Sequence, residues 1–146
     1  MTEKPVFWFF KLFKCQACTL FEGHLFSRLL QDPVVRQAVV LEQVTFGQNS
    51  ETGETYHLES EFPDFASKIS YAPYLWLAKP YDESQGYHLN PSTMNNKTLN
   101  TRLQGKEYVY GPTSTYEELR NWLLTNARSL SSNASTFHGR KPQYSR

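Results

Sequence analysis

Two cysteines separated by two residues, Cys15 and Cys18, have the type and spacing needed for redox chemistry. They follow an apolar run and stand where a helix is expected to begin. The amides and dipole of a helix N-terminus favour negative charge, and the thiolate is the species that attacks a disulfide. Lys11 and Lys14 add positive charge nearby. The pattern predicts a redox pair in which Cys15 attacks and Cys18 closes a disulfide across one turn.

A structural zinc site is a second interpretation of the same spacing, but such a site needs four ligands. His24 is close in sequence, whereas His57, His88 and His138 are scattered and no second CxxC is present. The chain also lacks the glycine-rich nucleotide motifs and the GxSxG motif of serine hydrolases. We therefore expect no metal and no cofactor. A role for both cysteines as small, unreactive buried residues remains open.

The elements that must position these cysteines alternate between strands and helices. Hydrophobic patterning predicts strands at 6–13, 39–46, 74–78 and 107–110, and helices at 17–30, 33–38, 62–70 and 116–130. Asp32 is expected to cap the second helix, and Ser114 with Glu117 has the pattern of a capping box before the last helix. Helices between the early strands require a parallel crossover, whereas the late strands can form a hairpin. An α/β sandwich with a mixed sheet is the predicted fold class.

Length and composition exclude several classes of protein. A chain of 146 residues that is 39% hydrophobic and 15% aromatic is long and apolar enough to fold as one domain. A net charge of +1 argues against nucleic-acid binding through a dominant basic field. The apolar run from Val6 to Phe13 is too short to span a membrane. We expect an intracellular, cytoplasmic protein.

Composition also divides the chain into a domain and a tail. Residues 1–130 are expected to form the domain, with a polar insertion at 79–105 that is rich in Asn, Ser and Thr. Residues 131–146 have the composition of a loop, carry three bases and no acid, and show no hydrophobic period. Such a segment is disordered unless a partner holds it, so we expect an extended tail that is disordered or contacts neighbouring subunits.

Four features in the expected order resemble the thioredoxin superfamily. The first is the CxxC that follows an apolar strand and opens a helix. The next three are a phenylalanine-containing helix leading into Asp-Pro-Val-Val, the run Tyr71-Ala72-Pro73-Tyr74 at the place of a cis-proline loop, and residues 108–123, which are similar to the closing strand and helix of protein disulfide isomerase domains. The resemblance covers roughly residues 5–130. It implies a thioredoxin-like sandwich with a central mixed sheet of four to five strands flanked by helices.

The resemblance also implies how a substrate would bind. Ala72 and Pro73 would present their backbone to the mixed disulfide of a substrate, beside Gln16 and Ala17 of the motif. Protein thiols and disulfides are the partners that this arrangement implies.

Three departures from the family pattern concern the same site. The residues between the cysteines are Gln16-Ala17, Phe9 stands where thioredoxins carry a buried aspartate, and Gly23 stands where a proline often kinks the helix. With no acid at Phe9, Glu22 is a candidate proton acceptor because it lies one helical turn from Cys18; a solvated glutamate on the helix surface is the alternative.

Two functions follow from the sequence. The first is an intracellular thiol–disulfide oxidoreductase in which Cys15 and Cys18 react. The second is a non-catalytic, thioredoxin-fold structural subunit of a large assembly, such as a minor capsid protein inside a virion, whose tail at 131–146 contacts its neighbours.

Overall fold

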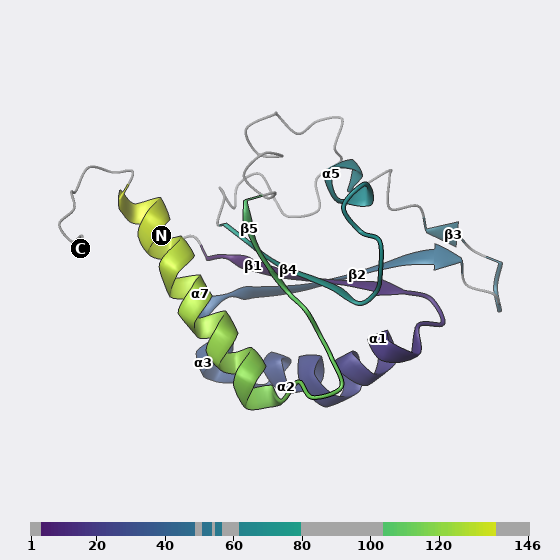
Figure 1. Cartoon of the computed structure of the whole chain (residues 1–146), viewed down its shortest axis with the longest axis horizontal. Helices are drawn as coiled ribbons and strands as arrows, with labels where there is room; N and C mark the ends of the chain where they lie inside the picture. The colour runs from purple at the N-terminus through teal and green to yellow at the C-terminus, as the bar shows by residue number, and fades with distance from the viewer. Residues whose placement is uncertain (1–3, 49–50, 54, 57–61, 80–103, 137–146) are drawn as a thin grey trace.

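The computed structural model describes residues 4–48, 51–53, 55–56, 62–79 and 104–136 (Figure 1). The strands are β1 (Val6–Leu12), β2 (Val40–Gln48), β3 (Thr55–Tyr56), β4 (Tyr74–Ala78) and β5 (Gly105–Tyr108). The helices are α1 (Gln16–Phe21), the π-helical turn η1 (Glu22–Phe26), α2 (Ser27–Leu30), α3 (Pro33–Ala38), α5 (Pro63–Ala66) and α7 (Tyr116–Thr136). The predicted insertion at 79–105 lies mostly outside the described residues.

The strands form a mixed sheet in the order β3-β2-β1-β4-β5. β1 and β2 are parallel, and the run α1–η1–α2–α3 makes the crossover between them. β4 is antiparallel to β1, and β5 is antiparallel to β4. This arrangement confirms the predicted α/β fold, a mixed central sheet flanked by helices. The sequence analysis did not predict the two-residue strand β3.

β1 is the centre of the sheet and is covered on both faces, as its continuous apolar sequence predicts. Its side chains alternate between the two faces of the sheet. Phe7 and Phe9 belong to a cluster that faces the crossover helices, whereas Trp8 and Phe10 belong to a cluster on the other face. All four side chains are fully buried. β4 alternates in the same way, with Leu75 and Leu77 in the first cluster and Tyr74 and Trp76 in the second.

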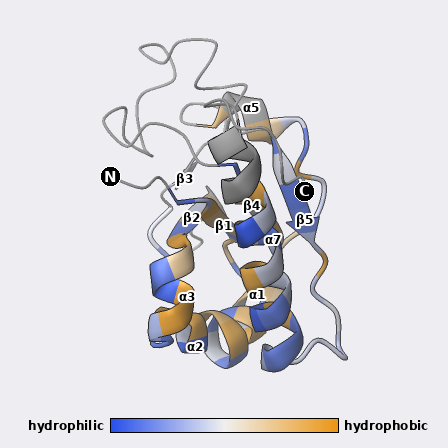
Figure 2. Ribbon diagram, turned by 90° about the vertical axis from the view of Figure 1, so that its left-hand side faces the viewer, coloured by the Kyte–Doolittle hydropathy of each residue, from blue (hydrophilic) through white to orange (hydrophobic). Residues whose placement is uncertain are grey.

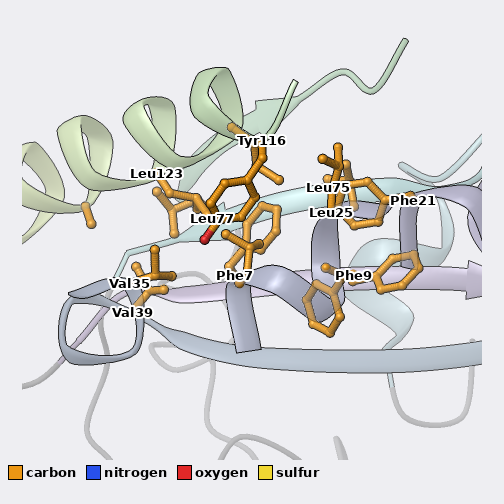
Figure 3. Close-up of a cluster of buried hydrophobic side chains, with 14 of the residues drawn as sticks. Phe7, Phe9, Phe21, Leu25, Val35, Val39, Leu75, Leu77, Tyr116 and Leu123 are labelled. Carbon is orange, nitrogen blue, oxygen red and sulfur yellow. The ribbon is translucent and has the colours of Figure 1, made fainter. Parts of the chain in front are cut away.

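The larger cluster fills the space between the sheet and the helices α1, η1, α2, α3 and α7 (Figure 3). Phe9 packs edge-on against Phe21 at 4.9 Å between ring centroids and against Phe26 at 5.0 Å. Leu119 and Leu123 of α7 are fully buried members of the same cluster. These helices carry hydrophobic residues next to hydrophilic ones, as amphipathic helices do when one side is buried (Figure 2). Cys18 is a member of this cluster.

The opposite face of the sheet is covered by α5. Phe62 and Phe65 are buried against Phe10, at 5.6 Å and 5.0 Å between ring centroids. The helix itself is shorter than the predicted 62–70, because it ends at Ala66. This second cluster carries no cysteine.

Asp32 ties the end of the crossover to the last helix. Its Oδ1 accepts hydrogen bonds from the amides of Val34 and Val35, which confirms the predicted cap of α3. Its Oδ2 accepts from the Tyr116 hydroxyl and from Arg120 Nε, both at 2.7 Å. These hydrogen bonds lower the pKa of Asp32 to about 2. Burial, followed by the hydrogen bond to Asp32, raises the pKa of Tyr116 to about 12.

Both ends of α7 differ from the sequence prediction. The capping box predicted at Ser114 and Glu117 is wrong by one residue: Thr115 Oγ1 accepts from the Glu118 amide, and Glu118 Oε1 accepts from the Thr115 amide. Ser114 Oγ accepts from the Gly111 amide instead. The helix continues past the predicted boundary at 130 to Thr136, so the first part of the segment expected to be extended is helical. Residues 137–146 lie outside the described part of the chain.

Candidate redox site

A tight turn carries the chain from the end of β1 into α1. The Cys15 amide donates to the Leu12 carbonyl at 3.3 Å, and the Phe13 amide donates to Phe46 of β2 at 3.0 Å. Lys14 adopts a left-handed backbone conformation with φ of 60°, which is uncommon for a residue other than glycine. This turn brings Cys15 directly to the start of the helix.

Cys15 and Cys18 are joined by a disulfide, with their Cα atoms 5.1 Å apart. Cys15 is the N-cap of α1, and its Sγ accepts a hydrogen bond from the Cys18 amide at 3.1 Å. The two cysteines differ in burial, because Cys18 is fully buried whereas Cys15 retains some exposure. A partner sulfur can therefore approach Cys15 more readily than Cys18, which agrees with the predicted order of attack.

Lys11 and Glu22 form an ion pair at 2.5 Å. Lys11 lies near the end of β1, two residues after Phe9 and on the same face of the strand, toward the helices. Glu22 lies one turn after Cys18, because its amide donates to the Cys18 carbonyl. The side chains are 25% and 38% exposed, respectively. Glu22 is thus a paired rather than a free carboxylate.

The loop before β4 lies at the same edge of the sheet as the disulfide. β1 and β4 run antiparallel with Phe10 opposite Tyr74, so the end of β1 adjoins the start of β4. The peptide bond between Ala72 and Pro73 is cis. Ala72 and Cys15 pack against the same cluster, the one that contains Cys18. The fold therefore brings together two sites far apart in sequence, the cysteine motif and the cis-proline loop.

The remaining predicted site residues lie on the surface around Cys15. Gln16, Ala17 and Lys14 are exposed. Pro73 is partly buried. Contact of these residues with a substrate stays a prediction.

Tyr110 is a site residue that the sequence analysis missed. β5 ends at Tyr108, which is paired with Leu75 near the start of β4, so the chain leaves the sheet at the same edge. The Tyr110 ring packs edge-on against Phe21, with the ring centroids 5.3 Å apart, and closes one side of the cluster that holds Cys18. The sequence placed Tyr110 at the end of the predicted strand 107–110, whereas β5 covers Gly105–Tyr108, so the sequence pattern did not indicate this position for its ring.

Comparison of this chain with protein-family models, with curated proteins and with solved structures gives no match. No helix in the described part of the chain is long and apolar enough to cross a membrane. Over the same residues, no group of three His, Cys, Asp or Glu side chains is arranged to hold a metal ion. The site must therefore be interpreted from its own geometry.

Proposed function

We propose that this chain is a thioredoxin-like protein that carries out thiol–disulfide exchange at Cys15 and Cys18. The observation that carries the proposal is the disulfide between a partly exposed helix cap and a fully buried cysteine one turn later. The cis peptide bond at Pro73 and the mixed sheet flanked by helices support it, because both are what the thioredoxin resemblance of the sequence implies.

The exchange conserves atoms and electrons. In the reduced protein, the Cys15 thiolate attacks one sulfur of a substrate disulfide and releases the other as a thiolate. The Cys18 thiol then loses its proton and attacks Cys15, which frees the second substrate thiolate and forms the Cys15–Cys18 disulfide. The substrate gains two electrons, and protons from solvent complete its thiols. A low-molecular-weight dithiol restores the reduced protein, and the reverse sequence would oxidise a substrate dithiol.

Cysteine variants test this proposal on a small disulfide with a dithiol as reductant. We expect Cys15→Ser to abolish the catalysed reduction, because the attacking sulfur is lost. We expect Cys18→Ser, once reduced and then mixed with the small disulfide in the absence of the dithiol, to accumulate a mixed disulfide at Cys15, detectable by mass spectrometry of the intact protein. Catalysis by Cys15→Ser at the rate of the unmodified protein would overturn the proposal. So would a mixed disulfide that forms at Cys18 of Cys15→Ser but not at Cys15 of Cys18→Ser.

A further inference from the structure

One edge of the sheet, the outer side of β2, is open over most of its length. Within the described residues, β3 is the one strand on that side, and it pairs only with Gly47 and Gln48. Residues 40–46 pair with β1 on their other side. Figure 2 shows β2 and β5 on opposite sides of β1 and β4. We call residues 40–46 the open edge. No residue of β2 is buried, whereas every residue of β4 is.

Two hydrogen bonds show which backbone groups of the open edge point outward. The Val40 amide donates to the Pro5 carbonyl at 2.9 Å, and the Phe46 carbonyl accepts from the Phe13 amide at 3.0 Å. In a parallel pair, one residue bonds to the neighbouring strand through both its N–H and its C=O, and the next residue directs both groups to the other side. Even-numbered residues of the open edge therefore bond to β1. The residues whose N–H and C=O groups point outward are Leu41, Gln43 and Thr45.

The open edge lacks the features that usually prevent strand pairing between molecules. Native edge strands are commonly short, or they carry lysine, proline or several charges. β5 at the other edge follows this rule, because it has four residues and two of them are Lys106 and Glu107. The open edge is longer and has a single charged residue, Glu42. Its apolar side chains are partly exposed next to both core clusters: Leu41 beside the larger one, and Val40, Val44 and Phe46 beside the other.

We propose that the open edge pairs in antiparallel fashion with the open edge of a second copy of this chain, which forms a homodimer with one continuous sheet. A two-fold axis at Gln43 places this residue opposite the partner's Gln43, and it places Leu41 opposite the partner's Thr45. In an antiparallel ladder, residues that face each other through outward-pointing groups exchange both of their N–H···O bonds. Every outward N–H and C=O of the open edge therefore gains a partner.

Neighbouring registers do not satisfy the backbone in this way. A shift of two residues in one direction would set Thr45 opposite the partner's Val39, whose amide is already bonded to the Val35 carbonyl. The opposite shift would set Leu41 against the partner's Gly47, which already pairs with β3. The axis at Gln43 is thus the register that the structure favours.

The side chains agree with the same register. Val40 lies opposite the partner's Phe46, a β-branched and aromatic pair of the kind that stabilises antiparallel sheets. Glu42 lies opposite the partner's Val44 rather than opposite the same carboxylate of the second copy. A contact of this kind uses the same surface on both chains, so it closes as a dimer. The inference does not depend on exchange at the cysteines.

Charged substitutions at Gln43 test the register, because this exposed residue faces its own copy across the axis. Sedimentation equilibrium measures the dissociation constant of the dimer. We expect Gln43→Lys and Gln43→Glu each to raise this constant about three- to tenfold, since like charges then stand directly opposite each other. An equimolar mixture of the two variants should dimerise at least as tightly as the unmodified protein. Gln43→Ala is the uncharged control and should change the constant less than about twofold.

Hydrogen exchange of backbone amides identifies what covers the open edge. In the dimer, the Gln43 and Thr45 amides are bonded to the partner, so their exchange should slow as the protein concentration rises. The Val44 amide faces β1 and is the internal reference, because it should be protected at every concentration. In Gln43→Lys, the Thr45 amide should exchange faster than in the unmodified protein at the same concentration.

Three results would overturn the dimer. The first is the mass of a single chain for the unmodified protein at concentrations up to about 1 mM. The second is slow exchange at Gln43 and Thr45 that does not vary with concentration, since a segment of the same chain would then cover the edge. The third is an equal dissociation constant for both charged variants and the unmodified protein. None of the three bears on exchange at Cys15 and Cys18, which is measured separately with the small disulfide.

Discussion

Asp32→Asn should destabilise the protein by a charge-dependent amount that can be calculated from the site. The substitution keeps an N-cap of nearly equal quality for α3 and removes the negative charge that faces Tyr116 and Arg120. Folding lowers the pKa of Asp32 from 3.8 to about 2. One pKa unit corresponds to about 1.4 kcal/mol, so the ionised carboxylate contributes about 2 kcal/mol to the free energy of unfolding. The side chain is 14% exposed, so solvent screening is weak.

The sign of the pH dependence follows from the direction of the shift. Because the pKa is lower in the folded state, the contribution is complete above the unfolded value of 3.8 and is lost as the pH falls toward about 2. We therefore expect the variant to be less stable by about 2 kcal/mol near neutral pH and by only a few tenths of a kcal/mol near pH 2.

Urea unfolding followed by tryptophan fluorescence measures the difference in unfolding free energy between the variant and the unmodified protein at each pH. Because both proteins are compared at the same pH, the contributions of the other titrating groups cancel. Glu117→Gln is the matched control because Glu117 is an exposed carboxylate in the first turn of the same helix that supplies Tyr116. It should cost less than about 0.5 kcal/mol. An equal loss of unfolding free energy for Asp32→Asn at both pH values would refute the electrostatic reasoning. A loss below about 0.5 kcal/mol at neutral pH would show that the hydrogen bonds from Tyr116 and Arg120 to Asp32 do not stabilise the protein.

Three further substitutions test the core, the sheet and the cap of α7. Phe9→Ala should lower the free energy of unfolding by about 3–5 kcal/mol in urea titrations, because it leaves a cavity between two phenylalanine rings under α1 and η1. Gly105→Ala should lower the melting temperature far more than Gly111→Ala: a Cβ at Gly105 would lie 2.0 Å from a backbone oxygen of β4, whereas nothing lies within 4 Å at Gly111. Thr115→Ala should cost about 1 kcal/mol of unfolding free energy through loss of the capping box of α7.

The sequence predicted best the elements that are bounded by local signals. β4 has the predicted bounds, Tyr74–Ala78, because a continuous apolar run stands between a proline and a polar segment. α3 begins at Pro33 as predicted, because Asp32 caps it and proline suits the first turn. In both cases a few neighbouring residues determine the backbone, so the pattern was sufficient.

Features that depend on tertiary contacts could not be predicted in the same way. Two overlapping capping boxes, Ser114–Glu117 and Thr115–Glu118, are equally good in sequence, and the second forms. The choice is consistent with Tyr116, whose hydroxyl reaches Asp32 at 2.7 Å from the first residue of the helix. The ion pair of Lys11 and Glu22 and the packing of Tyr110 on Phe21 likewise join separate elements.

The π-helical turn shows a local signal whose consequence was not foreseen. Gly23 stands at the position where the thioredoxin pattern often has a proline that kinks the helix. The helix instead widens over Glu22–Phe26, and Ser27 Oγ donates to the Gly23 carbonyl at 2.8 Å. π-helical turns are often found at functional sites. Here the turn begins one helical turn after Cys18, at the glutamate that pairs with Lys11.

The location of the candidate site is a consequence of strand order more than of any single residue. A parallel β1–β2 crossover places the helix cap of Cys15 at the carboxyl end of β1. An antiparallel β4 must then start beside that end, and an antiparallel β5 must finish there. Any chain with this order brings a motif after β1 next to the loops before β4 and after β5. In this chain the loop before β4 carries the exposed side chain of Tyr71, and the segment after β5 carries that of Val109.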